Sequence, residues 1–318
     1  MRSHRPNLIP CSLALVLAMT LVACAAGSDA GDPDGGAAEP PAFQVVSPEI
    51  QIAAGQEIVY CYYFHTPNTS MVAINQWVSD MTPGSHHMIL YFTDTAVQPD
   101  GTLNTCEAGG AGVIPIWTYS SQTPHQVAAM PADDGTGTPL AQEIPAGQPA
   151  YFQMHYLNVT DAPITVHVEL DAFALAAGTA YTRTASYVTY NASISIPPAA
   201  VNHVETRTCT VPAGIKFWEI STHSHKQSVH TDVKDGDAMT FTSDDWEHPG
   251  STQWSAPMFY TFASGKLTYE CTYDNIASNA GTTVVSGPSA QTNEMCMAIG
   301  YYFPATTPHM CFNSTLVQ

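Results

Sequence analysis

Two histidine pairs in the sequence could bind a transition metal. His86 and His87 are adjacent at the start of an apolar run, residues 81–92, that is typical of a buried strand. His223 and His225 are separated by one residue, so a regular strand would direct both imidazoles to the same side. Because neutral imidazole is the commonest protein ligand for such metals, both pairs are candidate metal ligands.

The adjacent pair needs a local distortion, because neighbouring side chains of a regular strand point to opposite faces. Pro83 and Gly84 stand directly before it and predict an irregular start to the strand. A third candidate is His155, in the strand-like run 151–156 that places Gln153 and His155 on one face. The chain has 13 histidines in 318 residues, so chance alone gives about 0.5 pairs of each spacing, and each motif needs corroboration.

Met295 and Cys296 lie in a further segment of interest, residues 293–302. The methionine thioether is a soft ligand that favours Cu(I), and together with imidazoles it suits a redox copper site. A methionine in a strand is more often a core residue. A blue-copper centre built from Cys296, Met295 and a histidine pair is another alternative, but it would leave one of an even number of cysteines unpaired.

The N-terminal residues 1–23 read as a signal peptide. Arg2 and Arg5 precede an apolar stretch that is too short for a comfortable membrane span. Residues 21–24 resemble a bacterial lipobox, which predicts lipidation of Cys24 after cleavage; a cleaved secretory peptide without an anchor is the alternative. Either way we expect an exported protein. With the lipobox it would be an outer-membrane, cell-surface or periplasmic lipoprotein that meets a membrane only through its lipid anchor.

Without the signal peptide and the lipidated cysteine, six cysteines remain: Cys61, Cys106, Cys209, Cys271, Cys296 and Cys311. In an oxidising compartment an even number predicts three disulfides, with 15 possible pairings. Metal-bound thiolates are the alternative, but the sequence contains no CxxC pair. The formal charge is −19 and only 11% of residues are charged, so there is no basic patch and no nucleic acid is expected as a partner.

The pattern of the chain predicts an all-β fold of two tandem antiparallel β-sandwich, jelly-roll-like domains. Residues 165–170 alternate polar and apolar, and turn-like tetrads ending in Gly55, Gly147, Gly178 and Gly214 precede strand-like runs. We expect a flexible tether at 24–42, an N-terminal domain at 43–160 and a C-terminal domain at 161–318. The boundary rests on a cluster of breaker residues at 158–163, and residues 175–179 are a second candidate.

Four motifs in order, HHM at 86–88, QMH at 153–155, HSH at 223–225 and EMC at 294–296, followed by Tyr301 and Tyr302, resemble a known family. They are similar to the copper type II, ascorbate-dependent monooxygenases, which include the peptidylglycine α-hydroxylating and dopamine β-hydroxylating enzymes. The resemblance extends over about residues 51–312. It implies two β-sandwich domains with one copper each, or two coppers per chain.

The resemblance also implies roles for single residues. His86, His87 and His155 match the ligands of a histidine-only copper, and His223, His225 and Met295 match those of the oxygen-binding copper at which catalysis occurs. The family's pairing further implies three disulfides: Cys61–Cys106, Cys209–Cys311 and Cys271–Cys296.

The expected activity is hydroxylation of a C–H bond of a small organic substrate with O2 and a one-electron reductant such as ascorbate. Ser221, Ile299 and Met297 stand where peptide-amidating members have an arginine, a tyrosine and an asparagine that hold the peptide carboxylate. A peptide substrate is therefore not expected, and the substrate and its binding residues stay unknown. The alternatives are a non-catalytic copper-binding or storage lipoprotein of the same fold, and a surface interaction module whose histidines bind adventitious metal.

Overall fold

The structure is a computed structural model that describes residues 40–106 and 115–317. These residues form strands, turns and loops but no helix, which confirms the predicted all-β class. Accordingly, this part of the chain contains no apolar helix long enough to cross a membrane. The signal peptide, Cys24 and almost the whole predicted tether lie outside the described residues.

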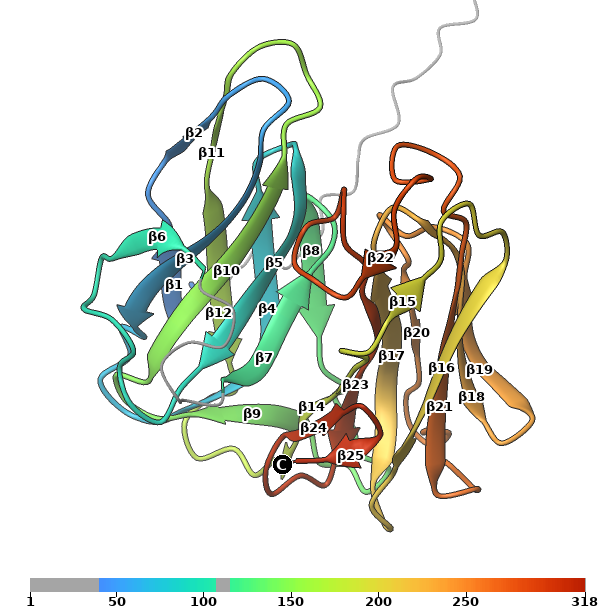
Figure 1. The fold of residues 1–318 in the computed structure, drawn as a ribbon. Coiled ribbons are helices and arrows are strands. Elements are labelled where there is room, and N and C mark those ends of the chain that lie inside the picture. Colours follow the sequence, from blue (N-terminus) through green and yellow to red (C-terminus); the bar gives the residue numbers. More distant parts are fainter. Residues whose placement is uncertain (1–39, 107–114, 318) are drawn as a thin grey trace, which may run out of the picture. The chain divides into compact units, whose positions relative to one another are not determined.

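The N-terminal sandwich is built from strands β1–β13 (Figure 1). The first six-stranded sheet has the order β1-β12-β4-β9-β13 with β8 beside β4, and the five-stranded sheet that faces it has the order β6-β3-β10-β5-β7. A short pair, β11-β2, extends from them. The bounds are β1 (Phe43–Val46), β2 (Ile50–Ile52), β3 (Glu57–His65), β4 (Val72–Met81), β5 (Ser85–Phe92), β6 (Leu103–Thr105), β7 (Ile116–Ser121), β8 (His125–Ala129), β9 (Leu140–Ile144), β10 (Pro149–Leu157), β11 (Ile164–Val166), β12 (Val168–Ala174) and β13 (Thr182–Arg183).

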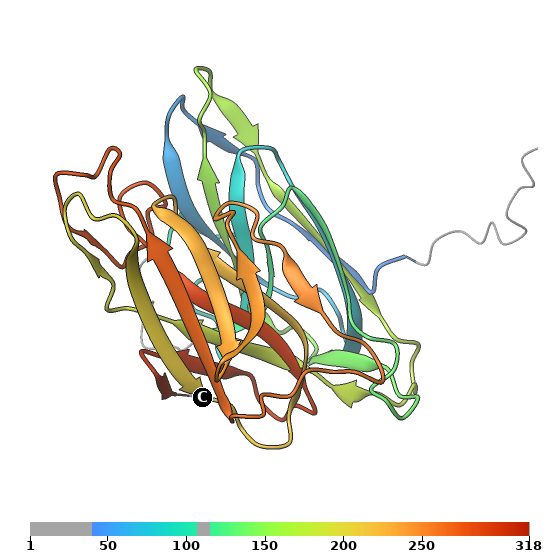
Figure 2. The ribbon, with the colours of Figure 1, turned by 90° about the vertical axis from the view of Figure 1, so that its right-hand side faces the viewer.

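The C-terminal sandwich is built from strands β14–β25, yellow to red in Figure 2. Its sheets have the orders β20-β17-β23-β14-β24-β25, β16-β21-β18-β19 and β15-β22. The bounds are β14 (Ala185–Tyr190), β15 (Ser195–Ile196), β16 (His203–Thr210), β17 (Lys216–Ser224), β18 (Ser228–Asp235), β19 (Ala238–Ser243), β20 (Ser251–Gln253), β21 (Lys266–Tyr273), β22 (Val284–Val285), β23 (Cys296–Phe303), β24 (His309–Phe312) and β25 (Thr315–Leu316).

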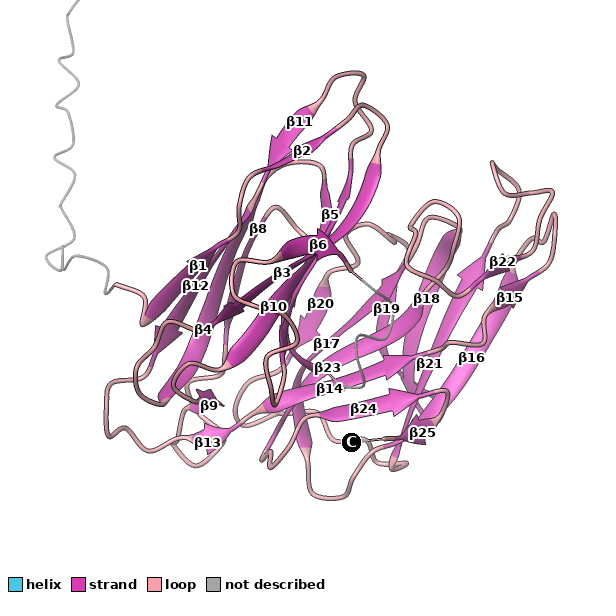
Figure 3. Cartoon of the chain, turned by 60° about the vertical axis from the view of Figure 1, so that its left-hand side comes forward, coloured by secondary structure: helices cyan, strands magenta, loops and turns pink. Residues whose placement is uncertain are grey.

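The change from one sandwich to the other falls later than the boundary predicted at residue 160. Strand β11 pairs with β2, β12 pairs with β1 and β4, and β13 pairs with β9, so all three belong to the N-terminal sheets (Figure 3). The breaker cluster at 158–163 is therefore a turn inside the N-terminal sandwich, and the second candidate, 175–179, lies nearer the change of sheets. By backbone contacts, the described residues form one compact unit.

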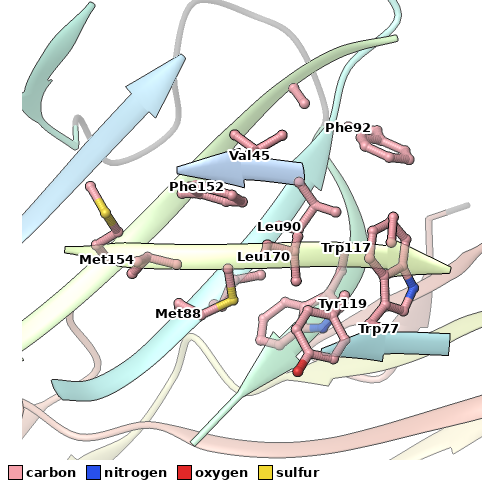
Figure 4. Close-up of a cluster of buried hydrophobic side chains, with 14 of the residues drawn as sticks. Val45, Trp77, Met88, Leu90, Phe92, Trp117, Tyr119, Phe152, Met154 and Leu170 are labelled. Atoms are coloured by element: carbon pink, nitrogen blue, oxygen red, sulfur yellow. The ribbon is translucent and has the colours of Figure 1, made fainter. Parts of the chain in front are cut away.

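The core of the N-terminal sandwich explains why β5 and β10 can present a site. Met88, Leu90 and Phe92 alternate along β5 and pack into this core, where Phe152 of β10 is also buried (Figure 4). Since successive strand residues point to opposite faces, the residues between them face away from the core. These outward positions of β5 begin with His87.

The outward face of this sheet packs against the C-terminal sandwich. Val188 of β14 and Met297 and Ile299 of β23 belong to the same buried apolar cluster as the N-terminal core. The structure also contains the three disulfides that the resemblance implies, Cys61–Cys106 in the N-terminal sandwich and Cys209–Cys311 and Cys271–Cys296 in the C-terminal one. The last of these fixes the start of β23, directly after Met295.

Candidate metal centre

A β-bulge at the start of β5 brings His86 and His87 together. Along β10, His155 lies opposite His87 and Tyr156 lies opposite Ser85, so His86 is the extra residue. Gly84 precedes the bulge with φ of 98°, a backbone conformation that glycine adopts without strain. Both imidazoles are buried and their ring centroids are 5.0 Å apart. The irregular start predicted from Pro83 and Gly84 is confirmed.

His155 completes the first group from the neighbouring strand. Its ring centroid lies 5.0 Å from that of His86 and 5.0 Å from that of His87. Gln153 shares its face of β10, as predicted, and its Oε1 is 3.4 Å from His87 Nε2. One ligand-type nitrogen from each of the three histidines lies within 4.8 Å of the others, so the three side chains can hold one metal ion.

The HSH motif supplies the second group at the end of β17. His223 and His225 are both buried, and their ring centroids are 5.3 Å apart. This is the shared side that their spacing predicts. Met295 stands just before β23, the strand that pairs with β17, and lines the same cavity as His87 and His223.

The two groups are not separate in the structure, because His86 belongs to both. Nitrogens of His86, His223 and His225 also lie within 4.8 Å of one another. The His223 ring centroid is 5.2 Å from that of His86 and 4.9 Å from that of His87. The five histidines therefore form one cluster where the start of β5 faces the end of β17. The ligand sets expected from the sequence did not include this contact.

The protonation of the cluster suits a metal. Burial lowers the pKa of His86, His87 and His223 well below the usual value, and neighbouring histidines lower it further. Burial and His155 lower the pKa of His225 to about 3. These four imidazoles are therefore neutral at physiological pH, which is the form that binds a metal.

Several nitrogens in the cluster have no hydrogen-bond partner among the described residues: His86 Nδ1 and Nε2, His87 Nδ1, His223 Nε2 and His225 Nε2. Buried polar atoms are normally paired, and an unpaired set on adjacent side chains calls for an explanation. Bound metal would account for one such nitrogen on each of the four histidines, because an imidazole binds a metal through a single nitrogen lone pair, and it leaves only the second nitrogen of His86 without a partner. The fit to a metal ion therefore rests on the geometry of the protein itself.

Residues 181–317 match the model of one protein family, the copper type II ascorbate-dependent monooxygenase C-terminal domain. Over these residues the chain is similar to that domain. The match contains His223, His225 and Met295 and confirms the resemblance drawn from the four motifs. His86, His87 and His155 lie before it, in the N-terminal sandwich.

No curated protein matches the chain. Among solved structures, one chain from the naturally occurring empty particles of Cowpea mosaic virus top component is similar at 6% sequence identity. The alignment covers 94% of this chain and 100% of that chain with a TM-score of 0.29. A score this low supports no inference about fold or function.

The second group of histidines is oriented by a residue of the other sandwich. Gln122 Nε2 donates to the Thr222 carbonyl at 3.1 Å, so its Oε1 faces His223 Nδ1 at 2.6 Å. His223 Nδ1 is then the protonated nitrogen, and the lone pair of Nε2 points into the cluster. Hydrogen bonds of this kind fix the tautomer and the ring orientation of a metal ligand. Gln122 carries no sequence signal that would have identified it.

Glu57 plays the same part for the first group. Its Oε1 lies 2.7 Å from His155 Nε2, and its carboxylate also accepts hydrogen bonds from Ser289 Oγ and the Ala290 amide at 2.7 and 2.6 Å. Burial by itself raises the pKa of Glu57, but these hydrogen bonds outweigh it and lower the pKa to about 2. The ionised carboxylate holds His155 and ties the segment before Met295 to β3. The sequence offered no sign of this contact over 98 residues.

Glu294, the first residue of the EMC motif, joins the elements of the second group. Its carboxyl group accepts hydrogen bonds from the amides of His225, Gln227 and Met295 at 3.0, 2.7 and 3.3 Å. Burial raises its pKa to about 8 although these hydrogen bonds oppose the shift. Glu294 therefore fixes the position of Met295 relative to the HSH motif.

A cavity of about 200 Å³ opens beside the cluster. Its walls include His87, His223 and Met295, and also Met297 and Ile299, two of the three positions at which peptide-amidating relatives hold a carboxylate. The third position, Ser221, lines a different cavity. Most of the remaining histidines are surface residues with acidic neighbours, as in the contacts His125–Asp80, His203–Glu205, His230–Asp244 and His248–Asp245.

Proposed function

We propose that this protein is a copper-dependent monooxygenase that hydroxylates a C–H bond of a small organic molecule, using O2 and a one-electron reductant such as ascorbate. The observation that carries the proposal is the five-histidine cluster, whose unpaired nitrogens face one another at the edge of a cavity that also contains the Met295 thioether. The match of residues 181–317 to the C-terminal domain of the copper type II ascorbate-dependent monooxygenases supports it.

The first group, His86, His87 and His155, would hold one copper through imidazoles alone, and His223, His225 and Met295 would hold the second. Bound copper supplies the one-electron steps needed to activate O2 for attack on a C–H bond. Imidazole suits both oxidation states, while the soft thioether favours Cu(I).

The protein's own residues prepare the site for this reaction. Gln122 holds His223 in the tautomer that directs the Nε2 lone pair into the cluster, and Glu57 fixes the ring of His155 through the contact with its Nε2. The burial of the histidines excludes water, which strengthens electrostatic interactions and limits side reactions of activated oxygen. The cavity beside His87, His223 and Met295 would place the substrate next to the second copper.

The test is oxygen transfer rather than oxygen loss, because free copper and ascorbate consume O2 without any enzyme. The full chain would be loaded with copper, freed of unbound metal and supplied with ascorbate, ¹⁸O2 and a set of small neutral, anionic and cationic organic molecules. We expect one ¹⁸O atom in a hydroxylated product, found by mass spectrometry, with His125→Ala as active as the wild type because His125 lies outside the cluster. Two tightly bound coppers with no ¹⁸O product would favour copper storage instead.

A further inference from the structure

The cavity beside the cluster has a chemical character of its own. None of the described residues that line it is an aspartate, glutamate, lysine or arginine. Away from the metal ligands, much of the wall consists of aliphatic, aromatic and thioether side chains, among them Ile89, Tyr91, Trp117, Val188, Tyr190 and Met310. Apart from the metal ligands, the basic side chain on the wall is His309, whose ring stacks on Tyr302 with centroids 5.1 Å apart. An ionised ligand would find no carboxylate, ammonium or guanidinium group as a counter-ion here, and burying a charge without a partner is strongly unfavourable.

Several polar groups on the wall are already engaged, whereas Trp117 Nε1 has no hydrogen-bond partner among the described residues. Gln122 contacts His223 and the Thr222 carbonyl, Gln153 Oε1 lies beside His87, and Ser186 Oγ donates to the Trp117 carbonyl at 2.5 Å. Burial raises the pKa of Tyr91 well above its usual value, so its phenol stays neutral. These groups orient the site, and they offer no fixed charge to a ligand.

The size of the cavity narrows the ligand further. A protein cavity of about 150 Å³ accommodates benzene, whereas pockets for drug-sized molecules are usually about 300–1,000 Å³. The 200 Å³ found here therefore fits one ring and a few further atoms. Methionine sulfur and aromatic edges both make favourable contacts with an aromatic ring, and Met297, Met310, Tyr91 and Trp117 supply them.

We propose that the substrate class is a small, uncharged, largely apolar molecule of about the size of a substituted benzene ring. It would lie between β5 and β7 of the N-terminal sandwich and β14, β23 and β24 of the C-terminal one, with one end at His87, His223 and Met295. This inference rests on the proposed function only in so far as the bound molecule is called a substrate. The selectivity of the cavity itself can be measured without any turnover.

The test compares three probes of matched shape, 2-phenylethanol, phenylacetate and 2-phenylethylammonium, at pH 7. Binding to the full-length protein loaded with Cu(I) would be measured anaerobically by calorimetry and ligand-observed NMR. Cu(I) is chosen because it is diamagnetic and binds carboxylates weakly. We expect the alcohol to bind at least about tenfold more tightly than either ion. Equal or tighter binding of an ion would overturn the proposal.

Two variants locate this binding in the cavity. Val188→Trp fills the space and should weaken binding of the alcohol at least about tenfold, while Val201→Trp, at a 59% exposed valine outside the lining, should not. If Val188→Trp misfolds, Met310→Arg at the half-buried edge of the cavity adds a cation and should shift the preference towards phenylacetate. A folded Val188→Trp that binds the alcohol normally, or a folded Met310→Arg without the shift, would refute the assignment. Selective binding without ¹⁸O product would leave the ligand class standing and reject the monooxygenase.

Discussion

The two metal-binding groups are positioned by different means. In the first group, His87 and His155 are direct neighbours across β5 and β10, so the register of a buried sheet sets their separation. In the second, Met295 precedes a strand, and the position of its segment relative to the HSH motif depends on hydrogen bonds to the Glu294 carboxyl group. His223 is oriented by Gln122 from the other sandwich.

The two groups therefore depend on different kinds of interaction. Backbone hydrogen bonds hold the first group inside one sandwich. The second requires correct packing of side chains and of the two sandwiches against each other. Packed interfaces between domains can shift between two arrangements. We therefore expect the second group to change its geometry more readily than the first, and ligands to exchange there during turnover.

The largest effect is expected for Met295→Ala. His223 and His225 can still hold copper, so metal analysis should find close to two coppers per chain. The preference for Cu(I) supplied by the soft sulfur is lost. Turnover should fall by more than about 100-fold, which exceeds the loss usually seen when a residue that only supports a metal ligand is mutated. Met258→Ala, at a methionine that is 76% exposed, is the control. Wild-type turnover in Met295→Ala would remove this residue from the site.

His155→Ala tests the other side of the comparison. It should release much of the copper of the first group and slow the delivery of electrons, while the second copper keeps its sulfur ligand. Copper per chain, combined with the copper–sulfur contribution in X-ray absorption, separates the two sites. Loss of both coppers would show that the shared His86 makes the cluster a single binding unit, and that the two groups cannot be compared as independent sites.

Local features of these groups could be predicted from the sequence, and contacts between distant residues could not. Pro83 and Gly84 indicated the bulge, and the spacing of His223 and His225 indicated a shared face, because both follow from strand geometry over a few residues. The order of the four motifs indicated the family resemblance, and this resemblance implied the disulfide pairs. The joint use of His86 by both groups depends on how the sandwiches pack, and nothing local in the sequence encodes this.

The same limit explains the misplaced boundary and the residues that were missed. Residues 158–163 carry strong turn signals, but their turn leads back to β2 and β1, more than 100 residues earlier in the chain. Glu57 and Gln122 are ordinary polar residues in the sequence. They gain a role only because folding brings them to histidines 98 and 101 residues away.

A moderate effect is expected when the hydrogen bonds behind the ligands are removed. Gln122→Leu leaves His223 Nδ1 without its acceptor and should weaken copper binding at the second group about 10–100-fold. Glu57→Gln, which keeps the shape but removes the charge, should do the same at the first group. Competition with a chelator would give both affinities. If each variant affected both coppers equally, the two groups would not be positioned independently.

The smallest effect is expected for Gly84→Ala, which strains the bulge without touching a ligand. At φ of 98°, a side chain at this position costs about 1–2 kcal/mol. Its Cβ would also lie 2.9 Å from Ile164 Cδ1, the end of a side chain that can move. We therefore expect a lower thermal midpoint and a few-fold loss of copper affinity at the first group, because His86 and His87 follow directly.

Gly101→Ala is the matched control for this variant. Its φ of 82° carries a comparable backbone cost, but no atom lies within 4 Å of the added Cβ, and the turn is outside the cluster. It should lower the thermal midpoint and leave both copper affinities unchanged. If Gly84→Ala also left the first group unchanged, the register of β5 and β10 alone would hold the bulge. In that case the geometry of the first group would not depend on the backbone conformation at Gly84, and the contrast with the second group would be sharper.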